Sequence, residues 1–322
     1  MTPMEQARER VRNWRSGTLD LSWLGLTELP ELPVNLTDLC CQNNQLTTLP
    51  DTLPSGLIEL SCSHNQLTSL PDTLPTSLTH LACVFNRLLS LPDTLPAGLI
   101  NLNCCFNQLT TLPDTLPTGL RMLVCCYNQL LSLPDTLPAG LIELHCDYNQ
   151  LTSLPDTLPA GIWYLKCLHN RLTKIPDTLP AGLTHLICFD NQLTKIPDIL
   201  PAGLMELSCS HNQLTSLPDT LPAGLQYLSC PHNQLTTLPD TLPASLTQLY
   251  CCSNNLPDRL NDESIPDYVA RVKTITDAKA EADSKERIVQ RCALYFEELA
   301  KKVWHPSRVE RLMLAGVDME DM

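Results

Sequence analysis

The sequence is poor in positive charge and has no long apolar run. Its 322 residues carry 21 Lys and Arg against 35 Asp and Glu, so the formal net charge is −14. Such a chain repels phosphate backbones and anionic membrane surfaces. This predicts a protein partner, and favours a basic one, with no nucleic acid and no membrane involved. No stretch approaches the roughly 18 apolar residues that a membrane span needs.

Signals for export and for catalysis are also missing. The opening MTPMEQARERVRNW has no apolar run and no cleavage-like site. We therefore expect no Sec-type signal peptide and a cytoplasmic protein, in the host-cell cytoplasm if the chain is a secreted effector or a viral protein. No phosphate-binding glycine loop, metalloprotease helix or nucleophile elbow occurs. The sequence predicts no enzyme, no cofactor and no metal site.

What the chain has instead is a repeat of 21 residues around the pattern LxxLxCxxNQLTxLPDTLPAG. The segment x-L-x-C-x alternates with period two, as a strand does. The LPDTLP half holds two prolines, so it must return as extended, polyproline-like chain. Each repeat then forms one turn of a solenoid. The predicted fold is an α/β repeat solenoid, a curved leucine-rich-repeat rod with a parallel sheet on its concave side.

A solenoid exposes its core at both ends, so we expect a helical cap at each. Residues 1–16 form the predicted N-terminal cap, in which Thr2 and Glu5 have capping-box spacing and Pro3 suits the first helical position. The apolar residues along one face of this helix are Met4, Ala7, Val11 and Trp14. Residues 17–257 form the predicted solenoid.

Residues 258–322 form the predicted C-terminal helical cap, because the period stops there and the composition becomes helical. We expect two or three helices packed on the final repeat. One is marked by the i, i+4, i+7 and i+11 spacing of Ile288, Cys292, Tyr295 and Leu299. The last is a short helix over WHPSRVERLMLAG.

Three residue types recur at fixed places in the repeat. We expect the cysteines to be buried, free thiols that pack as small hydrophobes, rather than disulfides or a metal ladder. They are Cys41, Cys62, Cys83, Cys104, Cys125, Cys146, Cys167, Cys188, Cys209, Cys230 and Cys251. We expect the asparagines to face inward and to hydrogen-bond the backbone of the turn. They are Asn44, Asn65, Asn86, Asn107, Asn128, Asn149, Asn170, Asn191, Asn212, Asn233 and Asn254.

The third type is aspartate, which we expect to form a solvated convex edge that keeps the rod soluble. The alternative is a surface that responds to cations or binds a basic partner. Its members are Asp51, Asp72, Asp93, Asp114, Asp135, Asp156, Asp177, Asp198, Asp219 and Asp240.

Aromatic residues are scarce, at 5% of the chain, and their placement carries the functional prediction. Three of the four phenylalanines and five of the seven tyrosines fall at predicted concave positions, where the repeat frame does not need them. We expect an apolar patch that binds a partner through aromatic anchors. The alternative is that these rings only stack on one another and stiffen the face. The predicted partner-binding residues are Val84, Phe85, Cys105, Phe106, Val124, Cys126, Tyr127, Tyr148, Tyr164, Leu168, Ile187 and Phe189.

Histidines are also concentrated on the predicted concave face. A metal site is disfavoured, because parallel side chains on neighbouring rungs are poorly aimed for tetrahedral coordination. The prediction is instead a partner affinity that changes with pH near the histidine pKa. The predicted pH-sensing residues are His145, His169, His211 and His232.

The stretches LDLSWLGLTELPELPVNLTDL and NQLTTLPDTLP resemble the short leucine-rich repeats of the YopM and IpaH group of bacterial type III effectors. The resemblance covers roughly residues 5–257 and implies a rod with a helical N-terminal cap. IpaH-type proteins add a ubiquitin-ligase domain with a Cys-x-Asp motif. Here Cys292 is followed by Ala-Leu-Tyr, so that activity is not implied.

Repeats with cysteine in the strand are also similar to those encoded by giant DNA viruses of amoebae. The effector resemblance implies a non-catalytic scaffold, and we expect a monomeric rod that binds another protein. The alternative is a structural component that assembles with itself, for example in a virus particle.

Overall fold

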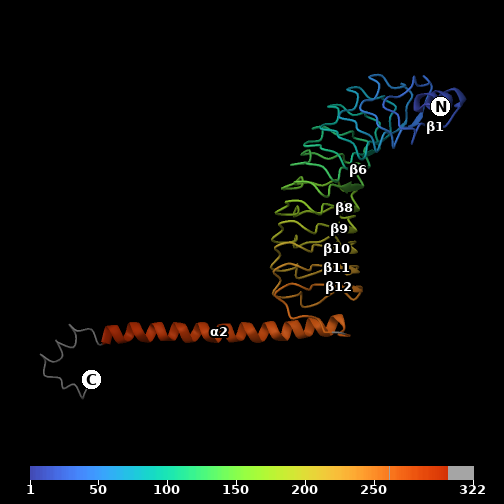
Figure 1. Ribbon diagram of the computed structural model, residues 1–322. Coiled ribbons are helices and arrows are strands. Elements are labelled where there is room, and N and C mark those ends of the chain that lie inside the picture. The colour runs from blue at the N-terminus through green and yellow to red at the C-terminus, as the bar shows by residue number, and fades with distance from the viewer. Residues whose placement is uncertain (261, 304–322) are drawn as a thin grey trace, which may run out of the picture.

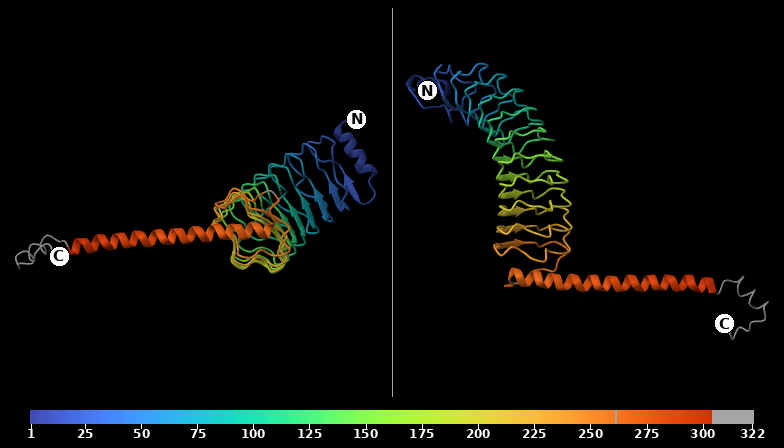
Figure 2. Two further views of the ribbon diagram at one scale, coloured as in Figure 1. Left: turned by 90° about the horizontal axis from the view of Figure 1, so that it is seen from below. Right: turned by 180° about the vertical axis from the view of Figure 1, so that it is seen from behind.

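The computed structural model, which describes residues 1–260 and 262–303, is a curved rod with a helix at each end (Figure 1). Twelve short strands form one parallel sheet in which every strand pairs with its neighbours in chain order. The strands lie on the inner side of the curve (Figures 1 and 2). They are β1 (Thr18–Asp20), β2 (Asp38–Cys40), β3 (Glu59–Ser61), β4 (His80–Ala82), β5 (Asn101–Asn103), β6 (Met122–Val124), β7 (Glu143–His145), β8 (Tyr164–Lys166), β9 (His185–Ile187), β10 (Glu206–Ser208), β11 (Tyr227–Ser229) and β12 (Gln248–Tyr250). The predicted leucine-rich-repeat rod is confirmed.

The N-terminal cap is the helix α1 (Pro3–Asn13). Its capping box is formed: the Thr2 amide donates to the Glu5 carboxylate at 2.7 Å, and the Glu5 amide donates to the Thr2 hydroxyl at 3.2 Å. Ala7 is fully buried against the first turn, and Met4, Val11 and Trp14 pack around it. The helix therefore seals the open end of the core, as its spacing predicts.

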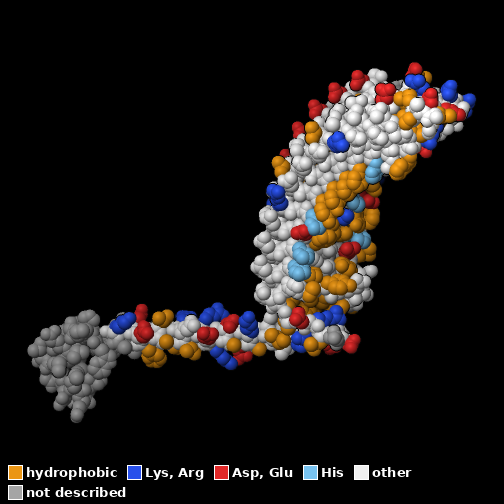
Figure 3. Space-filling view, in the orientation of Figure 1, with side chains coloured by type: hydrophobic (Ala, Val, Ile, Leu, Met, Phe, Trp, Pro, Cys, Tyr) orange, Lys and Arg blue, Asp and Glu red, His pale blue; other side chains and the backbone are white. Residues whose placement is uncertain are grey.

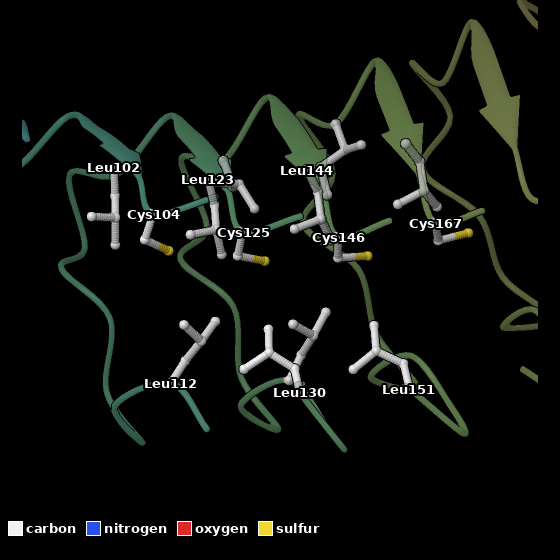
Figure 4. Close-up of a cluster of buried hydrophobic side chains, with 14 of the residues drawn as sticks. Leu102, Cys104, Leu112, Leu123, Cys125, Leu130, Leu144, Cys146, Leu151 and Cys167 are labelled. Atoms are coloured by element: carbon white, nitrogen blue, oxygen red, sulfur yellow. The ribbon is translucent and has the colours of Figure 1, made fainter. Parts of the chain in front are cut away.

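The core is a repeated layer of leucine and cysteine (Figure 4). The strand leucine and the cysteine two residues later point into the same interior, toward leucines on the opposite side of the turn such as Leu112 and Leu130. All eleven repeat cysteines are buried and free. Burial raises the pKa of the thiols at Cys62, Cys104 and Cys188 to about 12. These thiols are uncharged packing groups.

The repeat asparagines join consecutive turns, as expected. Asn128 donates through its amide nitrogen to the carbonyls of Cys104, Cys125 and Cys126 at 3.0, 3.1 and 3.2 Å. Its amide oxygen accepts from the Leu109 amide at 3.0 Å. One buried side chain thus satisfies backbone groups of two turns, and the same pattern recurs along the rod.

The proline-rich return path forms the outer side of the rod, and every aspartate of the predicted convex column is exposed. Two of these aspartates have a basic partner: Lys174 lies 3.5 Å from Asp156, and Lys273 lies 2.5 Å from Asp240. Figure 3 shows acidic residues along the outer edge of the N-terminal part of the rod. A role in cation binding stays a prediction.

The C-terminal segment differs from the expected bundle. Residues 265–303 form one helix, α2 (Ile265–Val303), which crosses the end of the solenoid and projects well beyond it (Figures 1 and 2). Tyr268, Val269 and Val272 are buried at its start, whereas Ile288 and Tyr295 are exposed. The expectation that the face of Ile288 and Tyr295 packs on the final repeat is wrong, because the helix continues straight away from it. The expected last short helix lies outside the described residues, and the three domain boundaries stay predictions.

No helix among residues 1–260 and 262–303 combines the length and the apolarity that a bilayer crossing requires.

Candidate protein-binding face

The residue before each repeat asparagine has an unusual backbone conformation. Its φ lies between 48° at His169 and 55° at Asn43, in the left-handed region, in all eleven repeats. Bulky side chains such as Phe106 (54°) and Tyr148 (51°) rarely adopt it. The turn is held because the Phe106 amide donates to the Cys126 carbonyl at 3.0 Å and the Asn107 amide donates to the Tyr127 carbonyl at 3.2 Å. Successive side chains therefore leave the rod in parallel, one per rung.

In the middle repeats these parallel side chains are rings, which stack in one continuous column. We call this column the aromatic ladder; it comprises His64, Phe85, Phe106, Tyr127, Tyr148 and His169. The centroid distances between successive rings are 4.5, 4.0, 4.1, 4.0 and 4.1 Å. Phe85 and Tyr127 keep 43% and 37% of their surface exposed. Figure 3 shows an apolar stripe along the inner side of the rod with histidines at its ends.

Most of the predicted partner-binding residues lie on or beside this ladder. Val84 and Cys126 are half-buried in the position just before a ladder residue, and Phe189 is half-buried in the same position of its repeat, before Asp190. Val124, Tyr164 and Ile187 are half-buried strand residues. The strand residues alternate with the buried core leucines, so they face the concave side.

The prediction that Cys105 and Leu168 lie on the binding surface is wrong. Cys105 and Leu168 are only 3% and 4% exposed. Their position turns toward the next rung, where the Cys105 sulfur accepts a hydrogen bond from the Cys126 amide at 3.0 Å. Neither side chain offers area to a partner.

A disulfide joins Cys105 to Cys126, whose Cα atoms are 4.7 Å apart. The pair lies outside the buried cysteine column and was not expected. The sequence signal for this disulfide is a second cysteine directly after the repeat cysteine in two consecutive repeats: Cys105 follows Cys104, and Cys126 follows Cys125. This bond ties together the two rungs that carry Phe106 and Tyr127.

A charged group that the sequence reasoning did not single out lies inside the same face. Asp147 directly precedes Tyr148 and is only 1% exposed. One of its oxygens lies 3.5 Å from the Lys166 ammonium, while Oδ1 has no hydrogen-bond partner in the described part of the chain. Burial raises the pKa of Tyr164, and the charges of Glu206 and Asp147 add to that effect. The Tyr164 hydroxyl stays protonated and can act as a donor.

The four predicted pH-sensing histidines fall into three environments. The His145 ring lies 3.3 Å from the Glu143 carboxylate and 5.1 Å from the Tyr164 ring centroid. His169 ends the aromatic ladder and contacts the Asp190 carboxylate. His211 and His232 stack on each other at 4.1 Å and are exposed. In each environment the histidine contacts a carboxylate or another aromatic ring, and protonation of the histidine would change that interaction.

The fold and this face define a leucine-rich-repeat protein, a class whose curved solenoids present extended concave binding surfaces. The chain is similar to YopM from Yersinia enterocolitica WA-314, with 36% identity over 78% of this chain and 59% of that one and a TM-score of 0.66. YopM from Yersinia pestis, a leucine-rich effector protein, shares 31% identity over 78% of this chain and 82% of that one, with a TM-score of 0.61. The chain belongs to the YopM family of leucine-rich-repeat proteins.

A third similar structure is the leucine-rich-repeat domain of FLRT2 in an octameric complex with Latrophilin 3 and Unc5D. The match has 25% identity over 72% of this chain and 80% of that one, with a TM-score of 0.61. This chain spans 59% of the length of the Y. enterocolitica protein. No family model and no curated protein matches it. These structures share the leucine-rich-repeat fold with the chain, and one of them was solved in a complex with other proteins.

Proposed function

We propose that the chain is a non-catalytic scaffold that binds a protein partner through the aromatic ladder on its concave side. The observation that carries the proposal is a continuous column of rings, partly exposed, at positions where the fold tolerates other residues. Asn43, Asp190 and Ser253 occupy the same place in other repeats with φ of 55°, 53° and 54°. The turn therefore forms without a ring, and the rings have another use.

The alternative that the rings only stiffen the face accounts for part of this arrangement. The rings do stack, with centroids 4.0, 4.1 and 4.0 Å apart, which is closer than the roughly 4.5–7 Å typical of aromatic pairs. Stacking covers the faces of each ring but leaves the outer edges of Phe85 and Tyr127 exposed. A row of exposed ring edges is the kind of surface that supplies binding hot spots.

The charges around the ladder favour a partner with basic residues beside its apolar contact. Glu143 and Glu206 lie on the strands of the same face, at half-buried positions, and Asp190 is exposed at the C-terminal end of the ladder. A partner with lysine or arginine next to an aliphatic or aromatic anchor would complement both features. The proposal includes a cytoplasmic location and an effector-like role, and the role is in keeping with the description of Y. pestis YopM as a leucine-rich effector protein.

The test is a triple variant in which Phe106, Tyr127 and Tyr148 are replaced by serine. A partner captured by the native chain is purified, and its affinity for both chains is measured by calorimetry. Loss of a single hot-spot aromatic, at about 2 kcal/mol or more, weakens binding at least about 30-fold, so the triple variant is expected to lose at least that much affinity. Unchanged affinity would reject the ladder as the binding site.

The matched control removes exposed apolar surface elsewhere on the rod. Leu89 and Leu131 are 60% and 58% exposed and lie outside the ladder. Their replacement by serine is expected to leave the affinity within about twofold. An equal loss in this control would show a non-specific effect of apolar area and would count against the proposal.

The histidines of this face support a pH-dependent affinity. Protonation of His145 beside Glu143, or of His169 beside Asp190, would form an ion pair with that carboxylate and so change the charge that the partner meets. We expect the affinity to change from about pH 5.5 to about pH 7.5, on either side of the ordinary histidine pKa. A flat profile, or one that is unchanged when both histidines are replaced by glutamine, contradicts this part of the proposal.

A further inference from the structure

The projecting part of α2 carries an apolar stripe that no described segment covers. Ile288, Val289, Tyr295 and Phe296 are 59%, 66%, 63% and 66% exposed, and Cys292 is an exposed free thiol. Their spacing of three and four residues places all five on one side of the helix, because an α-helix turns by 3.6 residues. A stripe of this size on a lone helix is a contact surface without its partner.

The geometry leaves this stripe accessible. The helix is anchored at Val272, which is 1% exposed, and continues to Val303. At 1.5 Å per residue the projecting part is about 45 Å long. Figures 1 and 2 show it leaving the rod sideways and extending away from the solenoid. A partner helix could lie along it without meeting the rod.

The charges along the helix indicate which partner fits. Residues 277–286, before the stripe, contain four acidic and two basic residues. Residues 287–302, which include the stripe, contain four basic and two acidic residues. Two such helices in antiparallel orientation place the acidic segment of each near the basic end of the other, whereas a parallel pair places like charges together. The helix is therefore complementary to a second copy of itself.

We propose that the outer part of α2 pairs with the same segment of a second copy in an antiparallel arrangement centred on Cys292. This is a two-fold contact in which Ile288 lies opposite Phe296 of the other copy and each Cys292 lies near its equivalent. Cys292 and Val272 are 20 residues, or about 30 Å, apart. The two rods thus stay on opposite sides of the contact, and both concave faces remain free. The dimer presents two aromatic ladders, which raises the avidity for a partner with two sites.

This proposal differs from the monomer expected on sequence grounds. The sequence also predicts that the helix containing Ile288, Cys292 and Tyr295 packs on the final repeat. The structure leaves this face open, so the same residues are available to another chain. The proposal does not depend on the aromatic ladder, because the two surfaces are at different places on the molecule.

The test uses the full chain and light scattering after size exclusion over a wide range of concentrations. The native chain is expected to give twice the mass of 35.8 kDa at high concentration. The double variant V289E/F296E introduces two charges into the stripe and is expected to raise the dimer Kd at least about 100-fold. L294E is the control, because Leu294 is 64% exposed but lies on the opposite side of the same helix. Equal helix content and melting temperature show that all variants are folded.

A second readout reports the centre of the contact. Among the described free cysteines, Cys252 is also exposed and Cys40 is half-buried, so a C40S/C252S background leaves Cys292 as the accessible thiol. A short bis-maleimide is expected to join two copies through Cys292 in this background and in L294E, but not in V289E/F296E.

Four results would overturn the proposal. They are a monomer at every concentration, no Cys292 cross-link, an equal loss of association in L294E, and association that survives V289E/F296E but disappears when the ladder rings are removed. Binding of the native chain to lipid vesicles that V289E/F296E abolishes would assign the stripe to a membrane surface instead.

Discussion

The ring of Phe106 lies on the ring of Tyr127 with centroids 4.1 Å apart and planes inclined by only 10°. Both residues hold a left-handed backbone, with φ of 54° and 52°. That conformation costs an ordinary residue about 1 kcal/mol or more, and a stacked ring pair contributes about 0.5–1.5 kcal/mol. Stacking therefore offsets much of the backbone cost, and the two effects can be separated by substitution.

The first prediction compares Phe106→Gly with Ser253→Gly. Both remove the cost of a positive φ, but Phe106 also loses its contacts with Phe85 and Tyr127 at 4.0 and 4.1 Å. We expect Phe106→Gly to lower the free energy of unfolding by about 2–3 kcal/mol, because the lost contacts and the greater flexibility of the unfolded chain outweigh the relief. Ser253 has no ring contact, so Ser253→Gly is expected to stay within about 1 kcal/mol of the native chain. Urea unfolding measures both, and equal shifts would show that stacking contributes nothing.

The features that repeat with the period are the ones that sequence reasoning predicted. Leu144, Cys146 and Asn149 are interior because period-two alternation and the 21-residue step fix their direction in every turn. The capping box of Thr2 and Glu5 follows from local spacing alone. These predictions needed no knowledge of contacts between distant segments.

The errors arose where residue type does not determine geometry. Asn43, His64 and Phe85 all adopt the left-handed turn, so no preference of one residue type predicts it from the sequence. Extending the strand alternation two residues past β5 predicts Cys105 on the surface, but the turn at this position changes the side-chain direction, and Cys105 is buried. The amphipathic spacing near Ile288 was recognised correctly, but spacing alone does not say whether the partner is the same chain or another.

The second prediction concerns alkaline pH. Burial raises the pKa of the thiols of Cys62, Cys104 and Cys188 to about 12, whereas an unfolded cysteine titrates near 9. Above pH 9 the unfolded chain loses these protons while the folded chain retains them, so stability must fall as pH rises. The difference between a pKa near 9 and a pKa of about 12 corresponds to about 4 kcal/mol per thiol by pH 12.

Urea unfolding at about pH 7.5, 9 and 10.5 measures this loss, since the pH dependence reports the difference in bound protons. We expect little change up to pH 9 and a steep decline above it. Cys252→Ala is the control, because this exposed thiol lies outside the core and its removal should leave the profile unchanged. Stability that is constant through pH 10.5 would mean that the cysteine column is accessible to water.

The third prediction concerns the anchor of α2. Tyr268 is 1% exposed, and its hydroxyl donates to the Pro257 carbonyl at 2.9 Å and accepts from the Cys251 thiol at 3.5 Å. Tyr268→Ala opens a cavity beneath the last turn and is expected to cost about 3–5 kcal/mol. Tyr268→Phe keeps the ring and loses only the hydroxyl contacts, so about 1 kcal/mol is expected.

Because contacts in a solenoid are between neighbouring turns, the damage should be local. Hydrogen exchange is expected to show lost protection at the Cys230 amide, which donates to the Tyr250 carbonyl of β12 at 2.8 Å. The Cys125 amide, which makes the equivalent bond to the His145 carbonyl in the middle of the rod, should keep its protection. Ile275→Ala, at a 45% exposed site on the same helix, is the control and should affect neither amide. If Tyr268→Ala leaves the Cys230 amide as protected as in the native chain, the last turn is stable without the helix, and α2 is an attached arm rather than a cap.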